Sequence, residues 1–111
     1  MINARTAEHY VWGAGCDAWR LASHEGLGVV QERIPPGKGE TRHLHHRARQ
    51  FFFVLSGVAS FERDDHTYEL RPHDGIDVPP GVPHRIVNAA DEDLVFLLVS
   101  HPNSRDDRSP A

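Results

Sequence analysis

The chain has 111 residues, of which 39% are hydrophobic and 25% are charged, and its formal net charge is −4. This length and composition predict one soluble globular domain, and the acidic balance with scattered Lys and Arg argues against nucleic-acid binding. The longest apolar run, Leu94–Val99, is far shorter than the ~20 residues of a membrane-spanning helix, and the first five residues lack the apolar core of a secretion signal, so we expect a cytoplasmic protein.

Short runs of β-branched and aromatic residues, separated by Gly, Pro and Asp, follow one another along the chain. No window of about a dozen residues keeps the apolar period of a helix, so the pattern predicts strands. The predicted strands are Ala18–Ala22, Leu27–Ile34, Thr41–His45, Gln50–Leu55, Val58–Arg63, His66–Leu70, Gly75–Val78, His84–Asn88 and Leu94–Ser100. Asp64 and Asp65 suit a hairpin turn, and Pro35–Gly39 suits a stiff loop. Such closely spaced strands predict an all-β barrel or sandwich with few exposed edges.

The predicted domain divides into three parts. Residues 1–26 hold N-terminal strands that pack on the barrel or on a dimer partner, residues 27–102 form the barrel, and residues 103–111 are a polar tail, expected to be mobile or to pack on a partner subunit. Cys16 is the only cysteine, so no internal disulfide forms and a core position is expected. We expect Tyr10, Trp12 and Trp19 to pack the end of the barrel or a dimer contact rather than to stack on a ligand.

Two predicted strands are apolar at every position, namely Phe51–Leu55 and Leu94–Val99. A strand with one wet face alternates apolar and polar residues, so both faces of these strands should be covered. One face looks into the barrel, and a second subunit covering the other face would make a homodimer. A layer formed by the segment Tyr10–Trp19 would cover the same surface, and this alternative stays open.

Histidines cluster in the stretch His43-Leu44-His45-His46. Successive strand side chains point to opposite faces, so His43 and His45 look the same way, and His46 in the following turn is expected to face solvent. Gln50 opens the next strand, where it comes within reach of a metal held by the two histidines.

A fourth candidate ligand follows the turn Pro79-Pro80-Gly81. Pro80 and Gly81 suit the centre of a type II turn, because Pro fixes φ and Gly supplies a positive φ. Pro83 holds Val82 extended, and His84 then opens the returning strand at a stiffly defined position, as a preorganised ligand requires.

These two stretches resemble the motifs of the cupin family. The first motif, G-x5-H-x-H-x3,4-E-x6-G, is matched by Gly37, His43, His45 and Gly57, with Gln50 in place of the glutamate; the second, G-x5-P-x-G-x2-H-x3-N, is matched by Pro79, Gly81, His84 and Asn88. His73 stands where the second motif has its first glycine. The flanking stretches look like a bacterial subgroup of small single-domain cupins. The resemblance implies a double-stranded β-helix (jelly-roll) barrel with one divalent metal bound by His43, His45, His84 and Gln50.

The replacement of glutamate by Gln50 changes the expected chemistry. Three neutral imidazoles and a neutral amide leave the charge of the ion uncompensated, which makes a stronger Lewis acid but a weaker metal site. Some sugar-derivative-processing members share this ligand set, which favours isomerase or lyase chemistry, whereas a displaced Gln50 would leave a three-histidine site like that of iron dioxygenases of the same family. Imidazole ligands suit Zn, Ni, Fe, Mn or Cu, and ligand type alone does not choose among them.

The sequence thus favours a metal-dependent enzyme (isomerase, lyase or dioxygenase) acting on a small oxygenated or sugar-derived substrate. The alternatives are a non-catalytic small-molecule-binding barrel of the sensor type and a metal-free barrel in which the histidines are structural. Glu32 is a weak candidate for the catalytic acid or base. Phe52 and Val54 share the parity of Gln50, so they line the cavity or fill the core, and Asn88 is either a donor to a ligand or a strand-end cap. Arg33, Arg42 and Arg49 either reach the substrate or are solvated.

Overall fold

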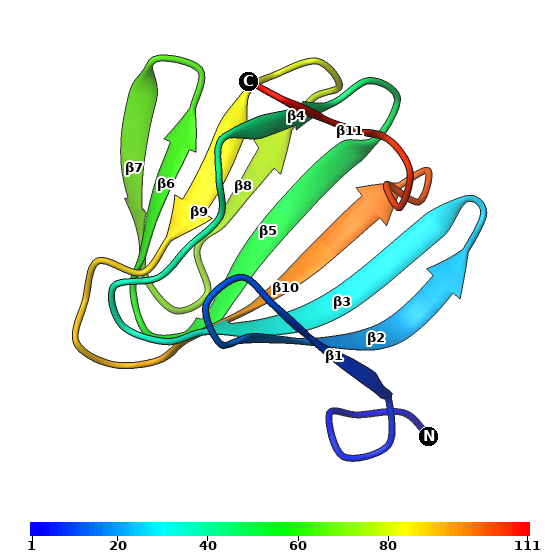
Figure 1. Ribbon diagram of the computed structural model, residues 1–111, viewed down its shortest axis with the longest axis horizontal. Coiled ribbons are helices and arrows are strands. Elements are labelled where there is room, and N and C mark those ends of the chain that lie inside the picture. Colours follow the sequence, from blue (N-terminus) through cyan, green and yellow to red (C-terminus); the bar gives the residue numbers. More distant parts are fainter.

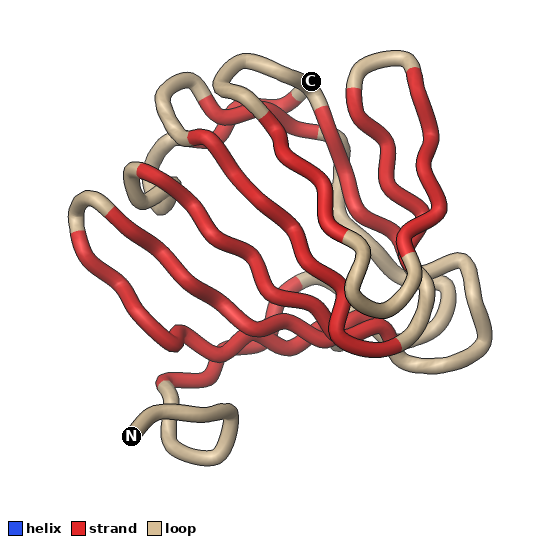
Figure 2. The backbone as a smooth tube through the Cα atoms, turned by 180° about the vertical axis from the view of Figure 1, so that it is seen from behind, coloured by secondary structure: helices blue, strands red, loops and turns tan.

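The computed structural model describes all 111 residues and contains strands, turns and loops throughout (Figure 1, Figure 2). The strands are β1 (Glu8–Trp12), β2 (Cys16–His24), β3 (Leu27–Ile34), β4 (His43–His45), β5 (Arg49–Ser56), β6 (Ala59–Arg63), β7 (His66–Leu70), β8 (Gly75–Val78), β9 (His84–Val87), β10 (Leu94–His101) and β11 (Arg108–Pro110). The structure holds no helix with the length and apolar character needed to cross a lipid bilayer.

Two antiparallel sheets face each other in a jelly-roll barrel, as the sequence predicts. The larger sheet has the strand order β1-β2-β3-β10-β5-β8, and the smaller has the order β11-β4-β9-β6-β7. Figure 1 shows the long strands β3, β10 and β5 running side by side. The chain crosses repeatedly between the sheets, so residues distant in sequence meet across the barrel.

The core fills the space between the two sheets at one end of the barrel. Alternating burial along β4, β6 and β9 gives each strand one inward face. Phe52 on β5 packs its ring 4.8 Å from that of Phe61 on β6 and 5.9 Å from that of Phe96 on β10, measured between centroids. Cys16 is a free thiol with no exposed surface, in agreement with its predicted core position.

Turn chemistry at the predicted hairpin is confirmed. Arg63 and His66 are the last paired residues of β6 and β7, so Asp64 and Asp65 form a two-residue loop. Asp64 has a φ of 54°, in the left-handed region that Asp tolerates better than most residues.

Strands β3, β7 and β8 have the predicted bounds, whereas β4 starts at His43 rather than Thr41. The residues before His43 bond elsewhere: Gly39 forms an isolated bridge with Val87, and the Glu40 N–H donates to the Ile86 carbonyl over 2.9 Å.

The N-terminal hairpin extends the larger sheet instead of covering it. β1 pairs with β2, and β2 pairs with β3, so both lie at the edge of the same sheet (Figure 1). The idea that Tyr10–Trp19 covers the outer face of β5 and β10 is therefore wrong. On that face Phe51 remains 41% exposed, and Phe53 and Leu97 are only half-buried.

The C-terminal tail is ordered, contrary to the expectation of a mobile segment. β11 pairs with β4, placing Arg108 opposite His45 and Pro110 opposite His43. The Asp107 carboxylate accepts hydrogen bonds from the backbone N–H groups of residues 46, 47 and 48 over 3.1, 2.8 and 2.9 Å. These bonds satisfy the tight turn between β4 and β5, which explains why a polar tail without an apolar pattern is fixed in place.

Candidate metal centre

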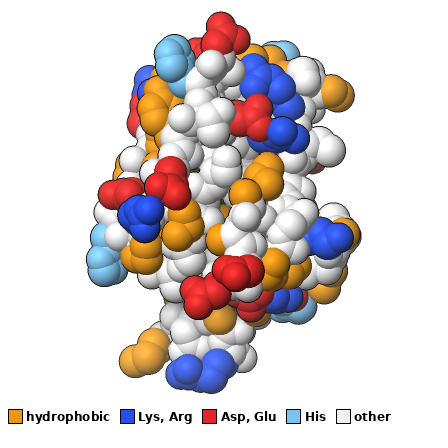
Figure 3. Space-filling view, turned by 90° about the vertical axis from the view of Figure 1, so that its left-hand side faces the viewer, with side chains coloured by type: hydrophobic (Ala, Val, Ile, Leu, Met, Phe, Trp, Pro, Cys, Tyr) orange, Lys and Arg blue, Asp and Glu red, His pale blue; other side chains and the backbone are white.

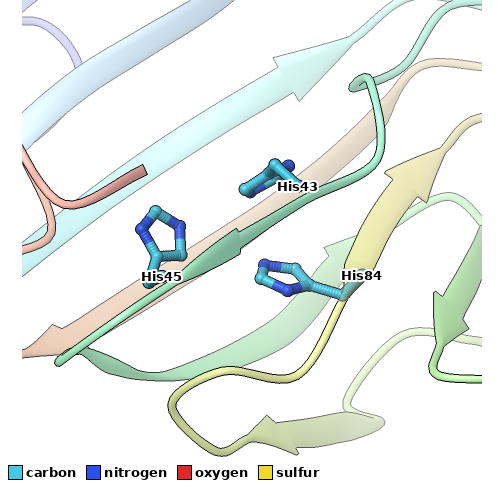
Figure 4. A group of neighbouring side chains, drawn as sticks. All are labelled: His43, His45 and His84. Atoms are coloured by element: carbon cyan, nitrogen blue, oxygen red, sulfur yellow. The ribbon is translucent and has the colours of Figure 1, made fainter. Parts of the chain in front are cut away.

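Three buried histidines meet at one point inside the barrel (Figure 4). His43 and His45 come from β4, and His84 opens β9 directly opposite His43. They are 2%, 6% and 1% exposed, and one ring nitrogen from each lies within 4.8 Å of the others. The predicted convergence of the three imidazoles is present in the structure, and His46 is exposed in the turn as predicted.

Each ring is held by a backbone carbonyl. Nδ1 of His43 lies 2.8 Å from the Thr41 oxygen, Nδ1 of His45 lies 2.9 Å from the Asp107 oxygen, and Nδ1 of His84 lies 2.9 Å from the Val82 oxygen. A carbonyl oxygen only accepts, so Nδ1 must carry the proton in every ring. In the neutral tautomer the lone pair of each Nε2 is then free, which is the arrangement that metal-binding histidines use.

Burial also keeps these rings neutral. Desolvation lowers the pKa of His43 to about 3 and that of His84 to about 4, and it lowers the pKa of His45 as well. Neutral imidazoles are the form that coordinates a cation, so no proton has to be removed near neutral pH.

The turn before β9 ties His84 to β4. Gly81 has a φ of 79°, as the third residue of a type II turn requires, and its N–H donates to the His45 carbonyl over 2.7 Å. The Val82 N–H closes the turn on the Pro79 carbonyl at 3.3 Å. The type II turn predicted from the sequence thus fixes His84 against the strand that carries the other two histidines.

Gln50 is the fourth residue at the site, and it is 2% exposed. Its Nε2 donates to the hydroxyls of Ser100 over 3.0 Å and Ser104 over 3.3 Å, which directs its Oε1 towards His84 Nε2 at 3.1 Å. With the His84 proton on Nδ1, this last contact brings two lone pairs together. A cation between them would relieve the contact.

The donor set therefore fits a divalent transition metal. Three neutral Nε2 atoms and an amide oxygen face the same point, and hydrogen bonds on their far sides orient all four. The nearest carboxylate outside this set is that of Glu40, whose Oε2 lies 3.9 Å from His43 Nε2.

A cavity of about 270 Å³ opens beside His43, His45 and Gln50. The other lining residues are of four kinds. Aromatic and apolar side chains come from Tyr10, Trp12, Ala22, Val30 and Leu98, and carboxyl groups come from Glu32 and Glu40. Guanidinium groups come from Arg20, Arg105 and Arg108, and the small or polar residues are Ser23, Gly28, Ser100, Asn103 and Ser104. This volume lies just below the ~300–1,000 Å³ of pockets for drug-sized ligands, so the cavity suits a small molecule.

Two carboxyl groups face this cavity in a dry environment. Burial, with a smaller contribution from Glu40, raises the pKa of Glu32 to about 8, and burial raises the pKa of Glu40 to about 7. Glu32 on β3 is 7% exposed, and the structure places this predicted acid or base at the cavity, as its role would require.

Other sequence-predicted residues lie away from the cavity. Phe52 and Val54 point inward and belong to the core, one of the two roles expected for them, and the Phe52 ring lies 5.8 Å from that of His84. Asn88 is a loop cap: its amide donates to the carbonyls of Ile34 and Glu92 and accepts from the Ala90 N–H.

The three arginines considered for substrate contact are occupied elsewhere. Arg33 pairs with Asp17 and Asp93, Arg42 pairs with Glu62, and Arg49 pairs with Asp77.

Several residues that line the cavity were not predicted from the sequence to do so. Tyr10 and Trp12 line the cavity, although Trp12 also packs against the core. Glu40 could have been suspected from the sequence, because it lies only three residues before His43. Nothing in the sequence indicated Arg105 and Arg108, because only the pairing of β11 with β4 brings the tail to the site.

Comparison with known proteins adds the family and the fold. A family model described as a cupin domain matches residues 30–100. The chain spans about half the length of the curated relatives that it matches.

Three solved structures superpose on nearly the whole chain. KdgF from Halomonas sp. has a TM-score of 0.86 at 21% identity, covering 94% of this chain and 95% of its own. A predicted oxalate decarboxylase from Thermotoga maritima has a TM-score of 0.85 at 18% identity, covering 93% and 99%. A sugar phosphate isomerase from Silicibacter pomeroyi DSS-3 has a TM-score of 0.83 at 23% identity, covering 93% and 76%. At these identities the likeness shows the fold alone.

Proposed function

This chain belongs to the cupin family, and on that premise we propose that it is a divalent-metal-dependent enzyme that acts on a small oxygenated or sugar-derived substrate inside the barrel. The observation that carries the proposal is the buried cluster of His43, His45 and His84 at the wall of a small cavity. In the proposed site Gln50 Oε1 is the fourth ligand. When bound, a divalent ion acts there as a Lewis acid on a substrate oxygen.

The residues around the cluster would supply the remaining functions. Glu32 lies on the cavity wall contributed by the larger sheet, and its protonated carboxyl could give a proton to the substrate and take one back. Tyr10, Trp12 and Leu98 would exclude water from the bound substrate. Proton transfer beside a polarised oxygen is what an isomerase or a lyase needs.

The position of Gln50 favours this class over a dioxygenase. A three-histidine oxygenase site requires the amide to swing away, whereas two serine hydroxyls hold Gln50 towards the cluster. Of the structural neighbours, one is named a sugar phosphate isomerase and another a predicted oxalate decarboxylase, which are activities of the same general kind.

The activity can be tested without knowing the substrate. We expect the metal-loaded protein to exchange hydrogen for deuterium next to the carbonyl of hydroxy-ketones and keto acids in D₂O, followed by proton NMR. Glu32→Gln should abolish exchange while metal content stays the same, and Glu69→Gln on the exposed strand β7 serves as the matched control. Binding of these compounds without any exchange would instead favour the alternative function, a non-catalytic small-molecule-binding protein.

We further propose that the protein is a cytoplasmic homodimer of bacterial type. The outer face of β5 and β10 carries Phe51, Phe53, Leu55, Leu97 and Val99 with no cover in the monomer, and a second copy of the chain would bury it. Light scattering after size exclusion should give twice the monomer mass. Phe51→Glu should give a monomer, whereas Leu27→Glu, an equally exposed apolar position at a hairpin end, should not.

A further inference from the structure

Three guanidinium groups line the cavity beside the histidine cluster, and they come from separate parts of the chain. Arg20 lies on β2, Arg105 in the loop before β11, and Arg108 on β11. Arg108 is paired with His45 across β4 and β11, and directly opposed residues in an antiparallel pair share one face, so both side chains face the cavity.

These arginines are weakly engaged by the protein itself. Arg105 and Arg108 form no ion pair, and the one hydrogen bond recorded from the Arg108 side chain goes to the Thr41 hydroxyl over 3.3 Å. Arg20 pairs at 3.2 Å with Glu8, whose side chain is 67% exposed, and lies 4.2 Å from the centroid of the Tyr10 ring. By contrast, Arg33 binds the carboxylates of Asp17 and Asp93.

The cavity is therefore cationic, although the chain as a whole carries a net charge of −4. The only carboxyl groups in the lining are those of Glu32 and Glu40, so three guanidinium groups face two carboxyl groups there, and burial raises the pKa of Glu32 to about 8. On the side of the molecule shown in Figure 3, acidic and basic side chains are interspersed. A wall of guanidinium groups recognises an anion, because the fork of N–H donors on Arg matches carboxylate and phosphate.

Trp12 also lines the cavity, and its buried Nε1–H lies near the Glu32 carboxyl but forms no well-aligned hydrogen bond with it or with another group. An acceptor oxygen on a bound molecule would complete the hydrogen bonding of this donor.

We propose that the cavity binds an anionic small molecule, with its carboxylate or phosphate held by Arg20, Arg105 and Arg108 and its oxygenated part turned towards the histidine cluster. This inference rests on the proposed function for the direction of the bound molecule, and it names the substrate class. The Arg105 and Arg108 side chains carry most of the recognition, because neither forms an ion pair within the protein.

The test uses three compounds that differ in one end group: glycerol, glycerate and glycerol 3-phosphate. Their binding is measured by calorimetry on the metal-free chain of 111 residues, so that a metal contributes nothing to anion binding. We expect at least one anion to bind tenfold or more tightly than glycerol, with an affinity that falls as salt is added. The stronger of the two anions identifies carboxylate or phosphate as the group recognised.

Variants assign the binding to the arginines. Arg105→Gln with Arg108→Gln should reduce the affinity for the anion at least tenfold and leave that for glycerol unchanged. Because Arg108→Gln changes a residue of β11 and could disturb folding, Arg105→Gln in the preceding loop is also tested alone. Arg71→Gln on the exposed surface is the matched control. Equal binding of the three compounds, no anion binding, or full anion affinity in the arginine variants would overturn the proposal. Metal uptake is measured separately on the same preparation. A protein that binds the anion but takes up no metal would contradict the proposed metal centre and leave the anion site in place.

Discussion

Gln50 departs from the cupin motif at a ligand position, and its surroundings suit an amide. The hydroxyls of Ser100 and Ser104 accept from its Nε2, so Oε1 is presented to the cluster. Gln50 and Ser100 are paired in register across β5 and β10, which places both on the inner face of the sheet. The amide position is thus built into the strand pairing.

Replacing Gln50 by Glu should tighten metal binding. The added negative charge compensates part of the ion's charge in a dry site, and the serine hydroxyls can rotate to donate to the carboxylate. We expect Gln50→Glu to raise the affinity for Zn²⁺ at least tenfold, or about 1.4 kcal/mol, measured by competition with a chromophoric chelator. Unchanged affinity would show that residue 50 does not contact the ion.

The buried carboxyls and histidines have opposite effects on stability as pH changes. Burial raises the pKa of Glu32 from 4.5 to about 8, so this group costs stability as pH rises through that range, and Glu40 acts likewise up to about 7. Burial lowers the pKa of His43 from 6.5 to about 3 and that of His84 to about 4, so these rings cost stability as pH falls below 6.5. The two effects oppose each other between pH 4.5 and 6.5.

Above pH 6.5 the carboxyl effect dominates, because the histidine effect fades within about one pH unit. The free energy of unfolding of the metal-free protein should therefore fall by about 1 kcal/mol between pH 6.5 and 8. Urea denaturation at the two pH values measures this, and Glu32→Gln should remove most of the fall. A wild-type protein equally stable at both values would contradict the burial of a neutral Glu32.

At the scale of elements, the tail holds the site together. The Asp107 carboxylate accepts three backbone N–H groups of the β4–β5 turn, and its carbonyl fixes the His45 ring. Asp107→Ala should cost about 2 kcal/mol, because three hydrogen bonds to a charged acceptor are lost and part of each is replaced by water. Thermal unfolding tests this, with the exposed neighbour Asp106→Ala as control; equal melting temperatures in the two variants would show that the turn does not need the tail.

The loop between β7 and β8 carries a residue in a costly conformation. His73 stands where the second cupin motif has glycine, and its φ is 72°. A non-glycine residue there costs roughly 1–2 kcal/mol, of which the greater flexibility of glycine in the unfolded chain offsets a part. His73→Gly should raise the free energy of unfolding by about 0.5–1 kcal/mol in urea titrations, and a loss of stability would mean that the stacking of His73 on Phe53 matters more.

Elements with strong local patterns could be predicted from the sequence, and those that depend on distant pairing could not. In β3, β7 and β8, apolar and polar residues alternate or turn residues mark the strand ends. One short strand positions His43 and His45, and one rigid turn positions His84. β11 has no pattern of its own, because it is held by backbone bonds to β4. Its Arg108 therefore escaped prediction as a cavity residue.

The sequence predicts which side chains of a strand point into the barrel, but it does not predict which residues of the opposite sheet they contact there. Phe52 and Val54 do point inward, as their parity indicates, but the opposite sheet places Phe61 against them and leaves no cavity there. Glu32 shares the inward direction and lines the cavity.

At the scale of the whole molecule, the two sheets contribute different residues to the site. The smaller sheet supplies the three histidines, and the larger supplies Gln50, Glu32 and Arg20 on the facing wall. The core residues fill the space between the sheets beside the cluster, and the arginines line the cavity. The proposed chemistry and the proposed anion recognition both depend on this arrangement.

Metal content is the most direct measure of the central claim that three imidazoles share one cation. Elemental analysis after incubation with Zn, Ni, Fe, Mn or Cu salts and gel filtration should find one tightly held ion per chain. His43→Gln, His45→Gln and His84→Gln should each lose it and stay folded; glutamine is preferable to alanine because His84 packs against Phe52 and Phe61. A wild-type protein that retains none of these metals, or variants that retain the ion undiminished, would contradict the account.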